Sequence, residues 1–203
     1  MKQQKAFTLA EVLVTLGIIG IIASLTMPSL IQNKKRQETT ARLKKFNSIM
    51  AQAVMLSENE NGTINDLLET SANVEEVEKW FDNYLAPYLK LEKASSKDSD
   101  RELTVYLADG SSFYIWKAYC TEIYFDINGK KKPNVMGRDQ YNFMICSEKI
   151  SGWADNKHWS SYYNSADKNR NSRLEKCKSQ ARFCSGLLEY DNWEFQDDYP
   201  YRL

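Results

Sequence analysis

The chain has little of what most enzymes use for catalysis. Its 203 residues include a single histidine, His158, and contain no glycine-rich phosphate loop. A histidine-based triad or a zinc site needs reactive and metal-ligating residues in recognisable sets. The four cysteines all lie beyond residue 119 and form no CxxC pair. The sequence therefore predicts a protein that is not an enzyme.

The chain also lacks a surplus of charge of either sign. It has 27 basic and 27 acidic residues, so its formal net charge is zero. Proteins that bind nucleic acid normally carry a basic surplus, so we expect no nucleic-acid partner. The length suits one membrane helix followed by one compact domain.

The most distinctive feature that is present is a long apolar run from Phe7 to Ile31, whose only charged residue is Glu11. At ~1.5 Å rise per residue, a helix of this length crosses the ~30 Å hydrocarbon core of a bilayer. An ionised carboxylate in lipid costs several kcal/mol unless it is paired, so Glu11 is a candidate functional residue. The run is longer than the apolar region of a secretory signal, which leaves an uncleaved signal anchor as an alternative.

The start of this run resembles the N-terminal processing and methylation motif of type IV pilins and type II secretion pseudopilins. The motif reads Lys5-Ala6-Phe7-Thr8-Leu9-Ala10-Glu11 here, with Ala6 where the family usually has glycine. The resemblance is strong over residues 1–55 and weak beyond them. It implies that prepilin peptidase cleaves after Ala6 and methylates Phe7. It also implies that Glu11 offers its carboxylate to the terminal amine of a neighbouring subunit.

The resemblance further implies a structural subunit of a type IV pilus or a type II secretion pseudopilus. Such a subunit sits in the bacterial inner membrane as a single-pass protein, with its C-terminal domain outside the cytoplasm. It assembles with other pilin subunits through an inner-membrane assembly platform. Pro28 matches a proline at which pilin-like helices can unwind in filaments. The basic residues Lys34, Lys35 and Arg36 oppose this orientation, because the positive-inside rule would keep them in the cytoplasm.

Two other functions stay open. One is a minor tip pilin or adhesin that binds a surface or polysaccharide through an aromatic-rich C-terminal segment, which includes Trp153, Trp159, Tyr162 and Tyr163. The same aromatic residues could instead fix an irregular loop onto a sheet. The other is a membrane-anchored domain that forms no filament.

The predicted organisation has four parts: a leader at residues 1–6, a transmembrane segment at 7–31, its amphipathic continuation at 32–60 and an extracytoplasmic domain at 61–203. The continuation carries apolar residues at steps of three and four, and Asn61-Gly62 should end the helix. Residues 63–94 again have helical spacing. Alternating residues predict strands at 103–107, 113–115, 122–127 and 141–146, with a turn at Asp109-Gly110. Residues 95–100 should form a loop, 173–181 a short helix and 187–201 a final strand. The predicted fold class is α+β, pilin-like, with a long helix on a small antiparallel sheet.

Two sets of residues in the domain are candidate sites. Asp126, Asn128 and Asp139 could bind calcium, because Asp-x-Asn-Gly opens many calcium loops. However, three lysines follow this loop and no glutamate stands at its twelfth position, so an Asn-Gly turn held by hydrogen bonds is the alternative. For disulfides, Cys177 and Cys184 can close a small loop, and Cys120 and Cys146 lie near the ends of neighbouring predicted strands.

Overall fold

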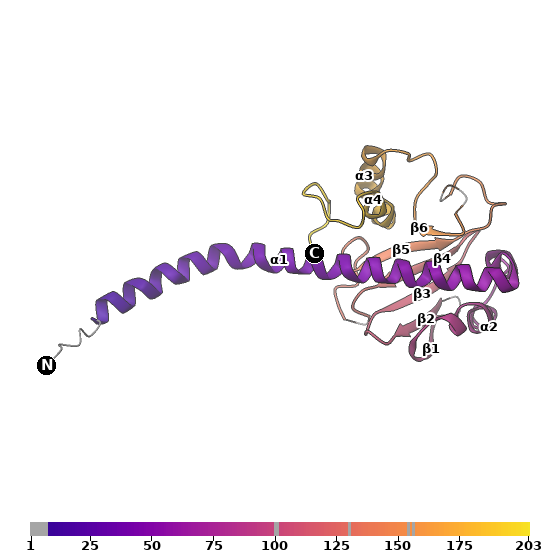
Figure 1. The fold of residues 1–203 in the computed structure, drawn as a ribbon, viewed down its shortest axis with the longest axis horizontal. Helices are drawn as coiled ribbons and strands as arrows, with labels where there is room; N and C mark the ends of the chain where they lie inside the picture. The colour runs from indigo at the N-terminus through magenta and orange to yellow at the C-terminus, as the bar shows by residue number, and fades with distance from the viewer. Residues whose placement is uncertain (1–7, 100–101, 130, 154, 156) are drawn as a thin grey trace. The chain divides into compact units, whose positions relative to one another are not determined.

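The computed structural model describes residues 8–99, 102–129, 131–153, 155 and 157–203. The chain divides into two units, Met1–Glu38 and Thr39–Leu203. The helix α1 (Leu9–Asn61) runs from the first unit into the second without a break (Figure 1). The second unit is an α+β domain that contains a six-stranded antiparallel sheet. The predicted fold class, α+β with a long N-terminal helix packed on an antiparallel sheet, is confirmed.

In the first unit, α1 is long and apolar enough to cross a membrane, as judged by length and composition. The predicted continuous helix is present from Leu9 onward, while Phe7 lies outside the described residues. Pro28 lies inside the helix. Proline has no N–H to donate to the carbonyl four residues earlier, so the backbone bond to Ser24 is missing at this point.

In the second unit, α1 buries the apolar stripe that its sequence predicts. The buried positions of this half include Leu43, Phe46, Met50, Ala53 and Val54. The Phe46 ring stacks on Phe125 with centroids 3.9 Å apart, and it meets the edge of Phe143 at 5.2 Å. This half of α1 therefore lies across one face of the sheet and fills the centre of the main core (Figure 1).

The sheet has the strand order β1-β2-β3-β4-β5-β6, which is also the order along the chain. Its strands are β1 (Leu91–Ser99), β2 (Glu102–Leu107), β3 (Ser112–Lys117), β4 (Thr121–Asp126), β5 (Gln140–Ile145) and β6 (Trp159–Ser161). Every neighbouring pair is antiparallel. In β3, β4 and β5 the residues Ile115, Ile123 and Phe143 face α1, and the intervening residues face the other side.

Four of these strands, β2 to β5, are those that residue alternation predicts. β1 and β6 are not among the predicted strands, and the loop expected at 95–100 is wrong where residues 95–99 belong to β1. An edge strand needs only its backbone to pair with its neighbour, so the polar sequence of β1 carries no alternating signal. β6 has only three residues, which is too short for a pattern.

The helices of the domain lie beside the two ends of the strand order (Figure 1). α2 (Val74–Tyr84) contacts β1 and β2, and it is preceded by η1 (Ile64–Leu67) and followed by η2 (Ala86–Tyr88). Asn73 and Glu76 form a capping box at the start of α2. The helical structure predicted over 63–94 is therefore present as three short helices, and residues 91–94 belong to β1 instead.

α3 (Arg170–Ser179) and α4 (Cys184–Tyr190) pack on each other beside β5 and β6, with η4 (Ala181–Phe183) between them. The final strand expected within 187–201 is wrong, because its first residues belong to α4. A Cβ added at Gly186 would lie 2.7 Å from the Cβ of Tyr163. Only glycine allows α4 to approach this segment so closely. The next two residues, Leu187 and Leu188, are buried in the main core.

Two disulfides stabilise the domain. Cys120 is bonded to Cys146, between the segments next to β4 and β5, and Cys177 is bonded to Cys184, between α3 and α4. These are the pairs that the positions of the cysteines suggest. Cys120 and Cys146 belong to a second, smaller core on the sheet face that lies opposite α1.

Candidate functional site

The first turn of α1 holds the candidate assembly residue Glu11. The backbone N–H and the hydroxyl of Thr8 both donate to Glu11 Oε2, each at 2.8 Å. In return, the Glu11 N–H donates to Thr8 Oγ1 at 3.3 Å. These contacts form a capping box, which satisfies amide groups that have no partner inside the helix. Glu11 is thus bonded to its own helix start. The predicted cleavage and methylation residues Ala6 and Phe7 lie outside the described residues.

The remainder of the apolar segment offers an uninterrupted surface to lipid or to other helices. Its leucine, isoleucine and valine side chains are exposed along the chain from Leu9 to Ile31. A Cβ added at Gly17 or Gly20 would meet nothing within 4 Å. The hydroxyls of Thr15, Ser24 and Thr26 donate to carbonyl groups of the preceding turn. These three hydroxyl groups are therefore satisfied within the helix, as side chains in hydrocarbon require.

The structure brings the candidate calcium residues together in one loop. Asp139 accepts hydrogen bonds from the backbone N–H groups of Asn134 and Val135, at 2.9 and 2.6 Å, and from the Asn128 amide at 3.2 Å. Asp126 accepts from the Asn128 N–H and from Gln140. Among the described residues, no group of three or more His, Cys, Asp and Glu side chains is placed to hold a metal. Protein donors already bond to the carboxylates of Asp126 and Asp139. Calcium binding at this loop stays a prediction.

Burial and charge also affect this loop. Burial raises the pKa of Asp126, and the charge of nearby Asp139 adds to that rise. A Cβ added at Gly129, which has φ +65°, would lie 2.8 Å from the Gly110 carbonyl oxygen. Gly129 is therefore needed both for the turn and for its contact with the β2–β3 turn. The loop is held at the end of the sheet by hydrogen bonds and by close backbone contact.

The aromatic-rich C-terminal segment is packed against the domain. Tyr162 and Tyr163 are buried, and Trp153 and Phe183 pack beside them over the Cys120–Cys146 disulfide. Trp159 stacks on Phe143 with centroids 5.3 Å apart, and its indole N–H donates to Asn47 of α1. These contacts support the interpretation that the aromatic residues fix an irregular segment onto the sheet.

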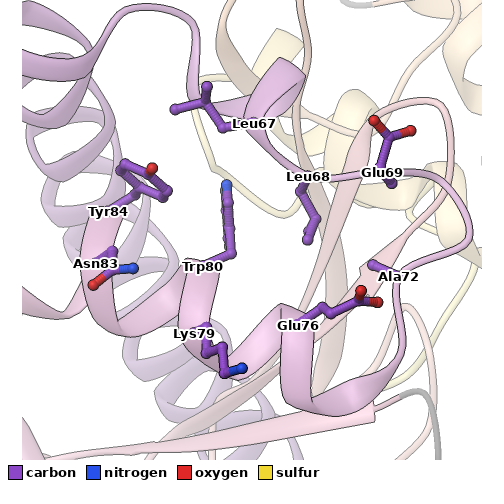
Figure 2. Close-up of a pocket in the computed structure, with 9 residues that line it drawn as sticks. All are labelled: Leu67, Leu68, Glu69, Ala72, Glu76, Lys79, Trp80, Asn83 and Tyr84. Atoms are coloured by element: carbon purple, nitrogen blue, oxygen red, sulfur yellow. The ribbon is translucent and has the colours of Figure 1, made fainter.

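A hollow of about 290 Å³ lies between η1 and α2 (Figure 2). The Trp80 ring stands at its centre, with its indole N–H donating to the Ile64 carbonyl at 2.8 Å. Glu69, Glu76 and Lys79 lie at its edge. Among these lining residues no nucleophile is paired with a base.

A buried lysine is the polar feature that sequence reasoning missed. Lys117 Nζ donates to the side-chain and backbone oxygens of Asn65, at 2.8 and 2.9 Å. The N–H and hydroxyl of Thr121 donate to the same Asn65 Oδ1. Burial lowers the pKa of Lys117 to about 8, although the charges of Asp66 and Glu69 oppose this shift. Alternation along β3 places Lys117 on the same face as Phe113 and Ile115. This alternation is the sequence pattern from which the burial of Lys117 could have been predicted.

His158 is a second polar residue whose environment differs from a free surface position. Its Nδ1 lies 2.5 Å from Glu58 Oε2, and its Nε2 lies 3.7 Å from Glu148. Glu58 also accepts from the Ile64 N–H at 3.1 Å. The single histidine therefore joins the end of α1 to the segment before β6, and among the described residues no hydroxyl or thiol nucleophile is bonded to it.

Comparison with known protein families gives one match for the N-terminal segment and another for the rest of the chain. Residues 1–27 match the prokaryotic N-terminal methylation motif. Together with the long apolar helix and the α+β domain, this motif defines a pilin-like protein. Residues 29–203 match a family of unknown function, DUF6613, and the chain belongs to that family. No curated protein and no solved structure shows significant similarity to the chain.

The motif supports several coarser conclusions about this protein. It implies processing by prepilin peptidase and assembly with other pilins, and it indicates a structural protein. The motif and the long apolar helix are both consistent with anchoring in a membrane. The motif ends before the globular domain begins, so the domain's particular role must be argued from its own residues.

Proposed function

We propose that this protein is a structural subunit of a type IV pilus or a type II secretion pseudopilus. The supporting observation is that the methylation motif leads directly into one continuous helix, which carries an apolar segment and then a domain-packing stripe. Such a helix can anchor the subunit in the inner membrane and later pack among the same helices of other subunits. The domain then lies outside the cytoplasm, where its two disulfides are stable.

In this proposal, cleavage after Ala6 makes Phe7 the new N-terminus, and Glu11 lies four residues after it in the mature chain. The Glu11 carboxylate pairs with the terminal amine of a neighbouring subunit inside the apolar bundle. Pairing removes the cost of two isolated charges in a medium of low dielectric constant. It also defines the axial stagger of the subunits, because any other register leaves both charges buried alone. Pro28 supplies a point at which the helix can loosen during assembly.

Mass spectrometry of the mature N-terminus tests the processing step. The expected result is a chain that begins at methylated Phe7 when the protein is expressed with its prepilin peptidase. A chain that keeps Met1 under those conditions would overturn the proposal and would favour an uncleaved signal anchor.

Substitution of Glu11 tests the assembly step. Glu11→Ala should be processed and inserted like the wild type, yet it should fail to enter filaments with its companion subunits. Thr15→Val, which removes an exposed hydroxyl in the same segment, is a matched control and should assemble. Normal filaments from the Glu11→Ala protein would contradict the assigned role.

A further inference from the structure

The basic residues that follow the apolar segment have no role in the assembly model, and their arrangement on α1 indicates a partner. Lys34, Lys35 and Arg36 are consecutive in the helix, and Ile31 ends the apolar run three residues before them. Lys34 and Lys35 are exposed, and Arg36 is half-buried. The acidic residue nearest in sequence is Glu38, which lies 3.9 Å from Lys34.

The depth of these residues matches the headgroup layer of a bilayer. With ~1.5 Å rise per residue, Lys34 lies ~4.5 Å beyond Ile31 along the helix, and Arg36 lies ~7.5 Å beyond it. The polar layer on each side of the hydrocarbon core is roughly 5–7.5 Å thick. If the apolar segment ends at the edge of the hydrocarbon, the three basic groups lie at the level of the lipid phosphates.

The directions of these residues favour a surface that surrounds the helix. Successive residues in an α-helix are ~100° apart, so the three side chains spread over ~200° of the circumference within ~3 Å of height. A neighbouring protein would contact one side of the helix, and its basic contacts would recur every three or four residues. A lipid headgroup layer meets the helix from all sides at one height, as these residues require.

The pairing of Lys34 does not satisfy its charge. The side chains of Lys34 and Glu38 are 77% and 62% exposed, and exposed pairs of this kind contribute between 0 and about 1 kcal/mol. Residues 32–38 contain three basic groups and one acidic group. The segment therefore keeps net positive charge beside the membrane, which complements anionic phospholipids.

We propose that Lys34, Lys35 and Arg36 form a basic collar that binds anionic phospholipid headgroups around α1. The collar holds the unassembled subunit at a fixed height in the bilayer. It also accounts for basic residues on the extracytoplasmic side of the helix, since lipid phosphates are available in both leaflets. The inference rests on the proposed membrane insertion of residues 9–31.

The test reconstitutes the full-length chain into lipid bilayers and measures which lipids it immobilises. Spin-labelled phosphatidylglycerol and phosphatidylcholine are compared by electron paramagnetic resonance, which separates lipids held at the protein from those in the bulk bilayer. We expect a preference for phosphatidylglycerol of roughly threefold or more, because each basic residue near the surface attracts anionic lipid. Raising the salt from about 0.1 M to about 1 M should remove most of it, because the Debye length falls from about 10 Å to about 3 Å.

The variant Lys34→Gln/Lys35→Gln/Arg36→Gln should lose this preference and still immobilise lipid to the same total extent. A matched control removes three exposed lysines of the globular unit, Lys44, Lys90 and Lys168, each replaced by glutamine. This control changes the net charge equally and should keep the preference. Loss of the preference in the control would overturn the collar as its source.

Three further outcomes separate this inference from the proposed function. If the wild type immobilises both lipids equally, the basic collar does not bind anionic lipid, but the proposed membrane insertion of residues 9–31 is supported. If the wild type immobilises neither lipid, residues 9–31 do not lie in the bilayer, and the membrane anchoring fails with the collar. If the collar variant keeps lipid selectivity but fails to form filaments, the basic residues contact a neighbouring subunit, which also overturns lipid binding.

Discussion

Thr8 donates two hydrogen bonds to one carboxylate oxygen of Glu11, from its backbone N–H and from its hydroxyl, each at 2.8 Å. The isolated subunit therefore keeps the Glu11 charge at the start of its own helix, where the helix dipole favours an anion. In the proposed filament, the amine of a neighbour must compete with Thr8 or share the carboxylate with it. This contact separates two roles of Glu11, helix capping and subunit pairing, which substitutions can distinguish.

Glu11→Gln and Thr8→Val should affect assembly differently. Glutamine can still accept from Thr8 but carries no charge, so we expect filament yield to fall by roughly an order of magnitude or more, since it leaves a neighbour's amine unpaired. Valine at position 8 keeps the Glu11 charge and removes the hydroxyl, which donates to the Glu11 carboxylate and accepts from the Glu11 N–H. Losing this cap costs about 1 kcal/mol of helix stability. Filaments of Thr8→Val should form at near-normal yield. Sheared-filament recovery measures both, and equal losses would show that capping alone matters.

Lys117 should make the stability of the domain depend on alkaline pH. Its folded pKa, about 8, lies below the ordinary value of 10.5, so the unfolded chain binds more protons between these values. The contribution of Lys117 to the free energy of unfolding should therefore rise as pH increases from 8 to 10.5, by at most roughly 3 kcal/mol. Below pH 8 the contribution of this group is constant and unfavourable.

Other groups titrate in the same range, so the prediction concerns a difference between two proteins. Denaturant unfolding in detergent gives the free energies of unfolding of the wild type and of Lys117→Met. Between pH 8 and 10.5, the difference between these two free energies should change in favour of the wild type. Lys79→Met, at an exposed lysine, should show no such trend. A constant gap for Lys117→Met would mean that Lys117 does not change its charge in this range.

The two disulfides should contribute unequally to stability. Cys120 and Cys146 are 26 residues apart, whereas Cys177 and Cys184 are separated by 7. Loop-closure entropy then predicts losses of roughly 3.5 and 2.5 kcal/mol when each pair is replaced by alanine. Thermal unfolding of the two double variants, each compared with the oxidised wild type, measures the two losses. A larger loss from the Cys177/Cys184 pair would show that packing of α3 on α4 outweighs the loop term.

Arg170 should not be replaceable by lysine. Its guanidinium binds Asp191 through Nε and Nη2, at 2.7 and 3.0 Å, and binds Asp198 through Nη1 and Nη2, at 2.7 and 2.6 Å. Lysine offers one point charge in place of two planar pairs, so Arg170→Lys should destabilise the domain by roughly 1–3 kcal/mol. Arg138→Lys, at an exposed arginine, is the control and should change the melting temperature little.

Asp139 distinguishes a loop held by hydrogen bonds from a calcium site. Asp139→Asn removes a charged acceptor for the amides of Asn134 and Val135, and we expect a loss of about 2 kcal/mol. If hydrogen bonds alone hold the loop, the loss is the same in chelator and in about 1 mM calcium. A melting temperature that rises with calcium in the wild type but not in the variant would instead establish a cation site.

Some features of this protein follow from residues that act locally. The apolar stripe of α1 that includes Phe46, the hairpin at Asp109-Gly110 and the strands β2 to β5 depend on periodicity and turn chemistry within short segments. The strand predicted at 187–201 is wrong because residues up to Tyr190 belong to α4, whose Gly186 packs closely against Tyr163. That contact joins two segments that are separated along the chain by α3, so neither segment records it alone.

The long apolar helix, the processing motif around Glu11 and the pilin-like class are each encoded in one continuous stretch of residues, so the amino-acid sequence is sufficient to predict them. The uses of the polar and aromatic side chains of the domain depend instead on how the chain folds. The fold places Lys117 on Asn65 and His158 beside Glu58, and it packs the aromatic residues between Trp153 and Tyr163 onto the sheet. The first two pairs are 52 and 100 residues apart in sequence. Their contacts arise from burial and geometry, which no local pattern records.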